Sequence, residues 1–277
     1  MTSKQQAAWR KQPGETKDSS GSLQSLGRAL RVLSLFTEDT ALGARAVGSH
    51  LDLSPAVAHR ILSTLAEVGF LEQDSTDRTY QLGWMVGQLG DAYYHTNRFH
   101  RIARQVLREL SVSTGETAAL HVLRNGYRVC LMQHESSQPL RYSIPLHAPM
   151  PVTNGATDQV LRAFASEPEL EEIRIVIERA TEGIEKPTLM GLDTTEHLKI
   201  DFDSVTEKQL EKIRQSRYKR GLGLRESGVG SLATVVQTVS ELFVLTLFGP
   251  IDRIESLDKS ENVVELLAAA AGTLERN

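Results

Sequence analysis

Four residues at helical spacing carry side chains suited to contact with a nucleic acid. Ala56, His59, Arg60 and Ser63 recur at intervals of three and four residues, so they share one face of a helix. Arginine and histidine can donate hydrogen bonds to bases or phosphates, and small residues allow close approach. A second stripe at the same spacing is apolar, which leaves one face to pack and the other to read DNA. Its members are Ala58, Ile61, Leu62 and Leu65.

The elements around this helix predict a winged helix-turn-helix over residues 23–83. Ser54 can cap the helix, Pro55 suits its first turn, and Gly69 can end it. Three helices followed by a hairpin, within such a short segment, are the elements of this motif. The other expected elements are helices over 25–36 and 43–50 and strands over 70–73 and 79–82.

Four further residues are candidates for DNA contact. Arg78 lies in the polar turn of the hairpin, from which a wing can reach a phosphate or the minor groove. Ser54 at the helix start, and Arg28 and Arg45 on the first two helices, can reach phosphates. Residues 1–83 carry equal numbers of basic and acidic side chains, so bulk charge gives no support to DNA binding. A ligand-sensing or dimerisation module with a degenerate helix-turn-helix is therefore the alternative.

The rest of the chain predicts a linker helix over 84–112 and an α+β domain with an antiparallel sheet over 113–277. Asn125 and Gly126 between two apolar runs are a strong hairpin signal. A second, more apolar hairpin indicates the centre of the sheet. The expected strands are 117–123, 127–133, 140–145, 231–239 and 242–248, and the expected helices are 155–165, 168–180, 206–220 and 252–274.

Composition limits the classes to which the chain can belong. Its single cysteine, Cys130, excludes an internal disulfide framework and a cysteine-based zinc site, and favours a reducing, cytoplasmic location. No apolar run is long enough to span a membrane. Residues 1–22 are polar and are expected to form a disordered tail. The net charge of −4 does not by itself indicate a nucleic-acid-binding protein.

Enzyme motifs are weak. Ser216 and Lys219 match the S-x-x-K pattern of serine acyl enzymes, but they lie in a charged helix with no partner motif, so a chance match is favoured. Gly221 and Gly223 lack the preceding strand of a dinucleotide loop, and the histidines lack the spacing of a metal site. We expect no catalytic residue, no metal and no cofactor.

The chain resembles the IclR type of bacterial transcription regulator along nearly all of its length beyond residue 22. The order and spacing of several short motifs carry the resemblance together, although each is weak by itself. They are the segments 25–33, 59–65, 69–71, 80–83, 139–141, 220–221, 228–233 and 249–250. The resemblance implies an N-terminal DNA-binding domain, a linker helix and a C-terminal domain that binds an effector and oligomerises.

The resemblance also implies partners and an effector site. Dimers or tetramers would bind double-stranded operator DNA, and a small organic effector, often an acid or an aromatic catabolite, would modulate that binding. The chain departs from the family pattern at Asp52 and Ala56, where glycine and serine are frequent, and at Asp158, near a frequent Gly-Lys pair. Matched positions give the candidate effector-binding residues, which are Arg141, Met150, Asn154, Thr157, Asp158, Ser231 and Phe243.

Overall fold

The computed structural model describes residues 24–37, 39–181, 188–189, 192–193, 204–259 and 262–276. Within this part the chain forms two compact units, and the division falls between Thr96 and Asn97. Each unit has its own hydrophobic core, so each is described by itself. The tail predicted at 1–22 lies outside the described residues.

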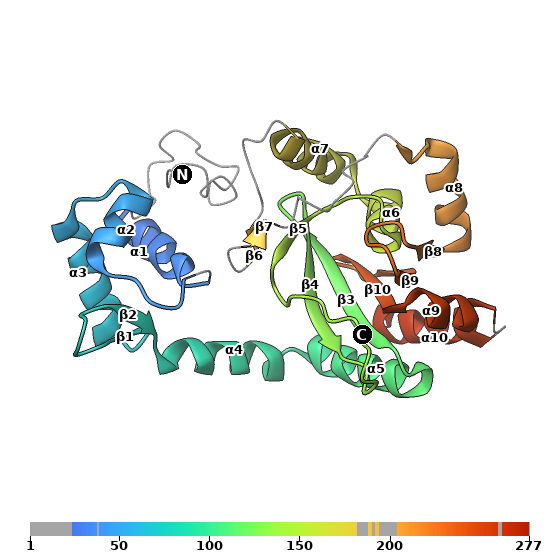
Figure 1. The fold of residues 1–277 in the computed structure, drawn as a ribbon, viewed down its shortest axis with the longest axis horizontal. Coiled ribbons are helices and arrows are strands. Elements are labelled where there is room, and N and C mark those ends of the chain that lie inside the picture. Colours follow the sequence, from blue (N-terminus) through green and yellow to red (C-terminus); the bar gives the residue numbers. More distant parts are fainter. Residues whose placement is uncertain are drawn as a thin grey trace. The chain divides into compact units, whose positions relative to one another are not determined.

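Unit 1 contains the three helices and the hairpin that the sequence predicts, followed by a fourth helix (Figure 1). Val32 and Leu35 of the first helix meet Leu62 of the third, and Leu71 and Tyr80 of the hairpin close the core. This arrangement confirms the winged helix-turn-helix. The elements are α1 (Gln24–Leu35), α2 (Ala44–Leu51), α3 (Pro55–Glu67), β1 (Leu71–Gln73), β2 (Tyr80–Leu82) and α4 (Trp84–Thr96).

The tight connection between α2 and α3 positions the recognition helix. Asp52 adopts the left-handed conformation, with φ 54° and ψ 47°, which aspartate tolerates better than most residues other than glycine. Ser54 Oγ then accepts a hydrogen bond from the backbone N–H of Val57 (3.3 Å), and Pro55 fills the first turn. Local sequence therefore sets where α3 begins.

The prediction of a single linker helix over 84–112 is wrong, because the chain forms two helices there. α4 ends at Thr96, and α5 (Arg98–Thr114) begins after Asn97. The backbone of Asn97 is extended, and its side chain accepts a hydrogen bond from the N–H of His100 (3.3 Å). An apolar repeat continues through such a cap, so periodicity alone does not show the break.

Unit 2 is built on a six-stranded antiparallel sheet with the strand order β5-β4-β3-β10-β9-β8. Asn125 and Gly126 form the turn between β3 and β4 with φ of 50° and 78°, as their sequence predicts. The strands are β3 (Thr117–Arg124), β4 (Tyr127–His134), β5 (Pro149–Pro151), β8 (Tyr218–Leu222), β9 (Val229–Gln237) and β10 (Leu242–Pro250). A separate short pair is formed by β6 (Thr188–Leu189) and β7 (Leu192–Asp193).

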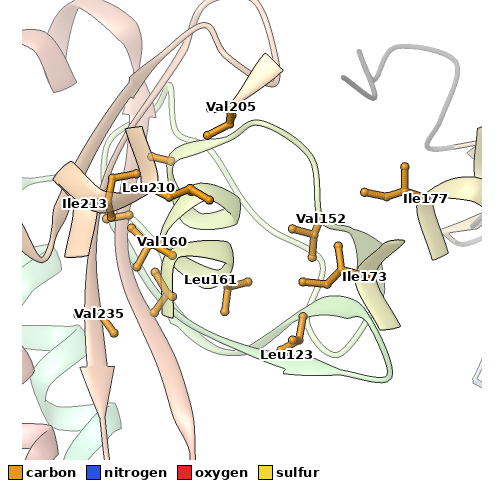
Figure 2. Packing of buried hydrophobic residues seen from close by; sticks show 14 residues of the cluster. Leu123, Val152, Val160, Leu161, Ile173, Ile177, Val205, Leu210, Ile213 and Val235 are labelled. Carbon is orange, nitrogen blue, oxygen red and sulfur yellow. The ribbon is translucent and has the colours of Figure 1, made fainter. Parts of the chain in front are cut away.

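Helices cover both faces of this sheet (Figure 1). α6 packs against β8, β9 and β10 on one face, and α5, α9 and α10 pack on the other. Figure 2 shows the core around α6, where Val160 and Leu161 lie between Leu210 of α8 and Ile173 of α7. The remaining helices are α6 (Ala156–Phe164), α7 (Glu167–Thr181), α8 (Glu207–Ser216), α9 (Ile251–Asp258) and α10 (Asn262–Glu275).

Three predicted elements of unit 2 are wrong. Residues 140–145 are not a strand, because a side chain takes the place of a strand partner there. The side-chain oxygen of Gln133 accepts a hydrogen bond from the N–H of Ile144 (3.0 Å), and its side-chain nitrogen donates to the carbonyl of Ile144 (2.8 Å). The helix predicted over 206–220 ends at Ser216, where Arg217 turns left-handed (φ 55°) and the chain pairs with β9 as β8. The final helix is divided into α9 and α10.

Candidate DNA interface and effector pocket

The exposed face of α3 is small and basic. Ala56, His59 and Arg60 are exposed, whereas Ala58 and Leu62 on the opposite stripe are fully buried. Ser63 is half-buried, and its hydroxyl donates a hydrogen bond to the carbonyl of Arg60 (3.0 Å). Because that hydroxyl is directed to the helix backbone, Ser63 would permit close approach of DNA through its small side chain. Arg60 and His59 remain the residues whose side chains can reach a base edge.

The four other candidate DNA contacts lie on separate elements of unit 1. Ser54 is exposed at the start of α3, and Arg28 and Arg45 are exposed on α1 and α2. Arg78 is exposed in the turn between β1 and β2, where its backbone is left-handed (φ 63°) and its carbonyl accepts a hydrogen bond from Gln73 (3.2 Å). Each is free to contact a phosphate without unfolding its own element.

Unit 2 contains a small, partly open cavity on the face of the sheet that carries α6. Its free volume is about 30 Å³, which is room for no more than one or two waters. We call it the arginine pocket, because two arginines form its polar wall. It is lined by Arg128, Tyr142, Ile144, Met150, Gly155, Ala156, Thr157, Gly221, Leu224, Arg225, Glu226, Val229, Ser231 and Phe248.

A buried carboxylate holds the two arginines together. Arg128 Nη1 lies 3.1 Å from Asp158 Oδ1, and Arg225 Nη1 lies 3.6 Å from Asp158 Oδ2. The side chains of Arg128 and Asp158 are 4% and 0% exposed, so water screens this cluster little. Asp158 Oδ2 also accepts hydrogen bonds from Thr153 (2.8 Å) and from the N–H of Gly155 (3.2 Å). Asp158 therefore fixes both the start of α6 and the position of Arg128.

Two guanidinium groups lie in this cluster beside the carboxylates of Asp158 and Glu226. Burial and the neighbouring Arg128 lower the pKa of Arg225 to about 10, which still leaves its guanidinium charged at neutral pH. The ring of His121 contacts the ring of Phe248 edge to face, with 5.7 Å between the centroids. Burial, and then the charges of Arg128 and Arg225, hold the pKa of His121 well below its usual value. With His121 neutral, the charged groups at the pocket are the guanidinium groups of Arg128 and Arg225 and two carboxylates. Asp158 is the buried carboxylate, and Glu226, which is exposed, also attracts Arg225.

The neutral state of His121 makes stability depend on pH. Because the unfolded chain takes up a proton on this residue below about pH 6.5 and the folded chain does not, acid favours unfolding. We expect His121→Leu to remove a slope of up to about 1.4 kcal/mol per pH unit from the acid side of the stability profile. Urea unfolding at pH 7.5, 6.0 and 5.0 measures this; parallel profiles for the two proteins would contradict it.

Of the candidate effector residues, Met150, Thr157 and Ser231 line the arginine pocket, and Asp158 lies against its wall. Arg141, Asn154 and Phe243 lie elsewhere. Arg141 is half-exposed and pairs with Glu135 (3.1 Å). The side-chain amide of Asn154 donates to Ser204 (2.7 Å). Phe243 stacks on Phe99 of α5 (4.7 Å), because its position in β10 directs it to the opposite face of the sheet.

Sequence reasoning missed the two arginines and the aromatic wall of the pocket. Arg128 was detectable as the one charged residue inside an otherwise apolar strand, a position that requires a buried partner. Arg225 gave no comparable signal, since a charged residue in a loop flanked by glycines is ordinarily solvated. Tyr142 and Phe248 resemble core residues in the sequence and join the pocket only through the fold.

Two features of the described residues concern metal binding and membrane insertion. No group of three or more histidine, cysteine, aspartate or glutamate side chains lies close enough to hold a metal ion there. None of the helices in the same part of the chain combines the length and the apolar character that a bilayer span needs.

Comparison with known proteins gives a consistent result. Residues 25–75 match the profile of the IclR helix-turn-helix domain. The chain is 33% identical over 128 residues to the HTH-type transcriptional regulator BhcR of Paracoccus denitrificans, and this match covers 46% of each chain, about half the length of that relative. It is 29% identical over 237 residues to the glycerol operon regulatory protein of Streptomyces griseus, which covers 84% of this chain and 87% of the relative.

A solved structure agrees over the whole fold. It is an IclR homolog from Microbacterium hydrocarbonoxydans complexed with 4-hydroxybenzoate, with a TM-score of 0.70, 21% identity, and coverage of 91% of this chain and 98% of the other. At 21% sequence identity, the similarity between the two proteins shows a shared fold. The helix-turn-helix match, the regulators among the relatives and the winged helix-turn-helix fold agree: residues 25–75 match an IclR helix-turn-helix domain, and the chain as a whole is similar to transcriptional regulators of the IclR type.

Proposed function

We propose that this protein is a transcriptional regulator that binds operator DNA in a sequence-specific manner and responds to a small organic effector. The observation that carries the proposal is the exposed face of α3 in a winged helix-turn-helix, with His59 and Arg60 between the small residues Ala56 and Ser63. A helix of this kind fits the major groove, and its basic side chains reach base edges. Ser54, Arg78, Arg28 and Arg45 would anchor phosphates.

The effector would occupy the arginine pocket and would be an acid or an aromatic catabolite. The guanidinium groups of Arg128 and Arg225 beside Ile144, Met150 and Phe248 suit an anion with an apolar body. The solved relative complexed with 4-hydroxybenzoate supports the same class. Of the matched candidates, Thr157, Ser231 and Met150 would contact the effector, and Asp158 would orient Arg128.

Self-association would pair two copies of unit 1 on the operator, as a dimer or within a tetramer. Trp84, Leu89 and Tyr93 of α4 are 61%, 52% and 49% exposed, and Leu26 and Leu30 of α1 are 54% and 57% exposed. Apolar side chains gathered on neighbouring turns of a helix favour contact with a partner.

The protein would be a cytoplasmic regulator without catalytic activity. The two residues of the S-x-x-K pattern lie on different elements: Ser216 lies at the end of α8, where its hydroxyl donates to the carbonyl of Tyr218 (3.0 Å), and Lys219 lies in β8.

Binding to the promoter of its own gene tests the proposal. Fluorescence anisotropy is measured with labelled promoter DNA and with a shuffled duplex of the same composition, at two salt concentrations. We expect the promoter to bind at least about 1,000-fold more tightly, and 4-hydroxybenzoate or another organic acid to change that affinity. Equal affinity for both duplexes would instead support a sensing module with a degenerate helix-turn-helix.

A further inference from the structure

The arginine pocket contains buried hydrogen-bond donors that have no partner among the described residues. Arg128 Nε and Arg225 Nη1 are buried and have no hydrogen-bond partner among the described residues, and neither ring nitrogen of His121 has one. Asp158, the carboxylate they share, accepts from Thr153 and Gly155 at Oδ2, and its Oδ1, which lies 3.1 Å from Arg128 Nη1, has no hydrogen-bond partner in the described part of the chain. Since unpaired buried guanidinium N–H groups are costly, the pocket is suited to an additional acceptor with negative charge.

The pocket has no room for such a molecule in its present form. About 30 Å³ of free volume is far less than a carboxylic acid with an apolar body occupies. Leu224, Arg225 and Glu226 form one wall, and all three belong to the connection between β8 and β9. The other walls belong to the sheet, to the start of α6, and to Tyr142 and Ile144 in the connection between β4 and β5. Movement of this one connection would enlarge the pocket without disturbing the sheet.

The connection, residues 223–228, has the features of a hinged segment. Gly223 and Gly228 at its two ends have φ of 61° and 82°, which glycine adopts without strain. Both ends are fixed, since the N–H of Gly223 donates to Val229 (2.9 Å) and the carbonyl of Gly228 accepts from Ile251 (2.9 Å). Leu224 and Ser227 between them are exposed. The segment can therefore swing about two anchored glycines.

We propose that residues 223–228 form a lid that opens to admit a carboxylate and closes on it through Arg225. The carboxylate would lie between the guanidinium groups of Arg225 and Arg128, and its apolar or aromatic body would contact Ile144, Met150 and Phe248. The inference rests on the proposal that this pocket is the effector site. Beyond that proposal, we infer that Arg225 recognises the negative charge of the effector and that residues 223–228 must move to admit it.

Calorimetry on the full-length protein without DNA tests the role of Arg225. The probes are benzoate, phenylacetate and pyruvate, with benzamide as the neutral counterpart of benzoate. We expect at least one acid to bind and benzamide to bind at least about 10-fold more weakly. Arg225→Gln should weaken the acid about 10- to 100-fold, and Arg225→Lys, which keeps the charge, should weaken it less.

Arg220→Gln is the matched control. Arg220 precedes the lid in β8, but its guanidinium pairs with Asp258 (2.8 Å) outside the pocket, so we expect unchanged affinity for the acid. Equal binding of benzoate and benzamide, full affinity in Arg225→Gln, or no binding of any of the three acids would overturn the inference. None of these results depends on DNA, so the helix-turn-helix proposal would stand or fall separately.

A label on the lid reports its movement. Cys130 is the single cysteine of the chain, it is fully buried, and burial raises the pKa of its thiol to about 12. An exposed cysteine introduced by Ser227→Cys therefore takes an environment-sensitive maleimide dye selectively. We expect the bound acid to change the fluorescence of the labelled protein, and Arg225→Gln to abolish the change. An acid that binds without altering the dye would contradict lid movement.

Discussion

Replacing Asp158 by alanine is expected to lower the free energy of unfolding of unit 2 by about 3–5 kcal/mol, the largest effect of any single change considered. The side chain of Asp158 is fully buried, and its carboxylate faces Arg128 at 3.1 Å and Arg225 at 3.6 Å. Removing it leaves two buried cations without their counter-charge and deletes the acceptor for Thr153 and Gly155.

Amide hydrogen exchange at the central strands β3 and β10, combined with urea unfolding, measures this loss for unit 2 alone. Glu171→Ala is the control, because Glu171 pairs with Arg174 (3.3 Å) on the surface of α7 and both side chains are about half-exposed. A surface pair of this kind contributes about 0–1 kcal/mol. Similar losses for the two variants would contradict a stabilising role for Asp158.

Replacing Arg60 by alanine is expected to weaken operator binding by about 1–3 kcal/mol for each chain, which is a loss of roughly 5- to 150-fold in Kd for each chain. The exposed position of Arg60 on α3 means that the change removes no packing, so the thermal stability of the protein should stay the same. Arg60 is expected to read a guanine, and the variant should therefore also tolerate substitutions at one base pair of each half-site.

Anisotropy with a set of singly substituted operators distinguishes base reading from simple charge attraction. A uniform loss over all operators, with the salt slope reduced by about 1, would assign Arg60 to a phosphate instead. Arg174→Ala is the matched control, because it removes an exposed arginine from a helix of unit 2. We expect no change in its operator affinity. Unchanged binding by Arg60→Ala would contradict DNA reading by α3.

The sequence predicted unit 1 well because the information there is local. A capping serine, a proline in the first turn and an apolar stripe at helical spacing define α3 within a few residues. The β3–β4 and β9–β10 hairpins were predicted for the same reason, since turn residues and alternating patterns lie next to one another. Where local and tertiary preferences competed, prediction failed: Tyr218–Leu222 continued a helical pattern but became an edge strand against β9.

The exposed basic face of α3 follows from the order of residues along one helix, so the sequence by itself determined it. The arginine pocket does not, because β4, α6 and the connection after β8 contribute Arg128, Asp158 and Arg225 from distant parts of the chain. Only the antiparallel order of the sheet brings these charges together, and only burial turns them into a site. A charge lies in water or in a core according to what packs against it, and the tertiary structure alone decides that packing.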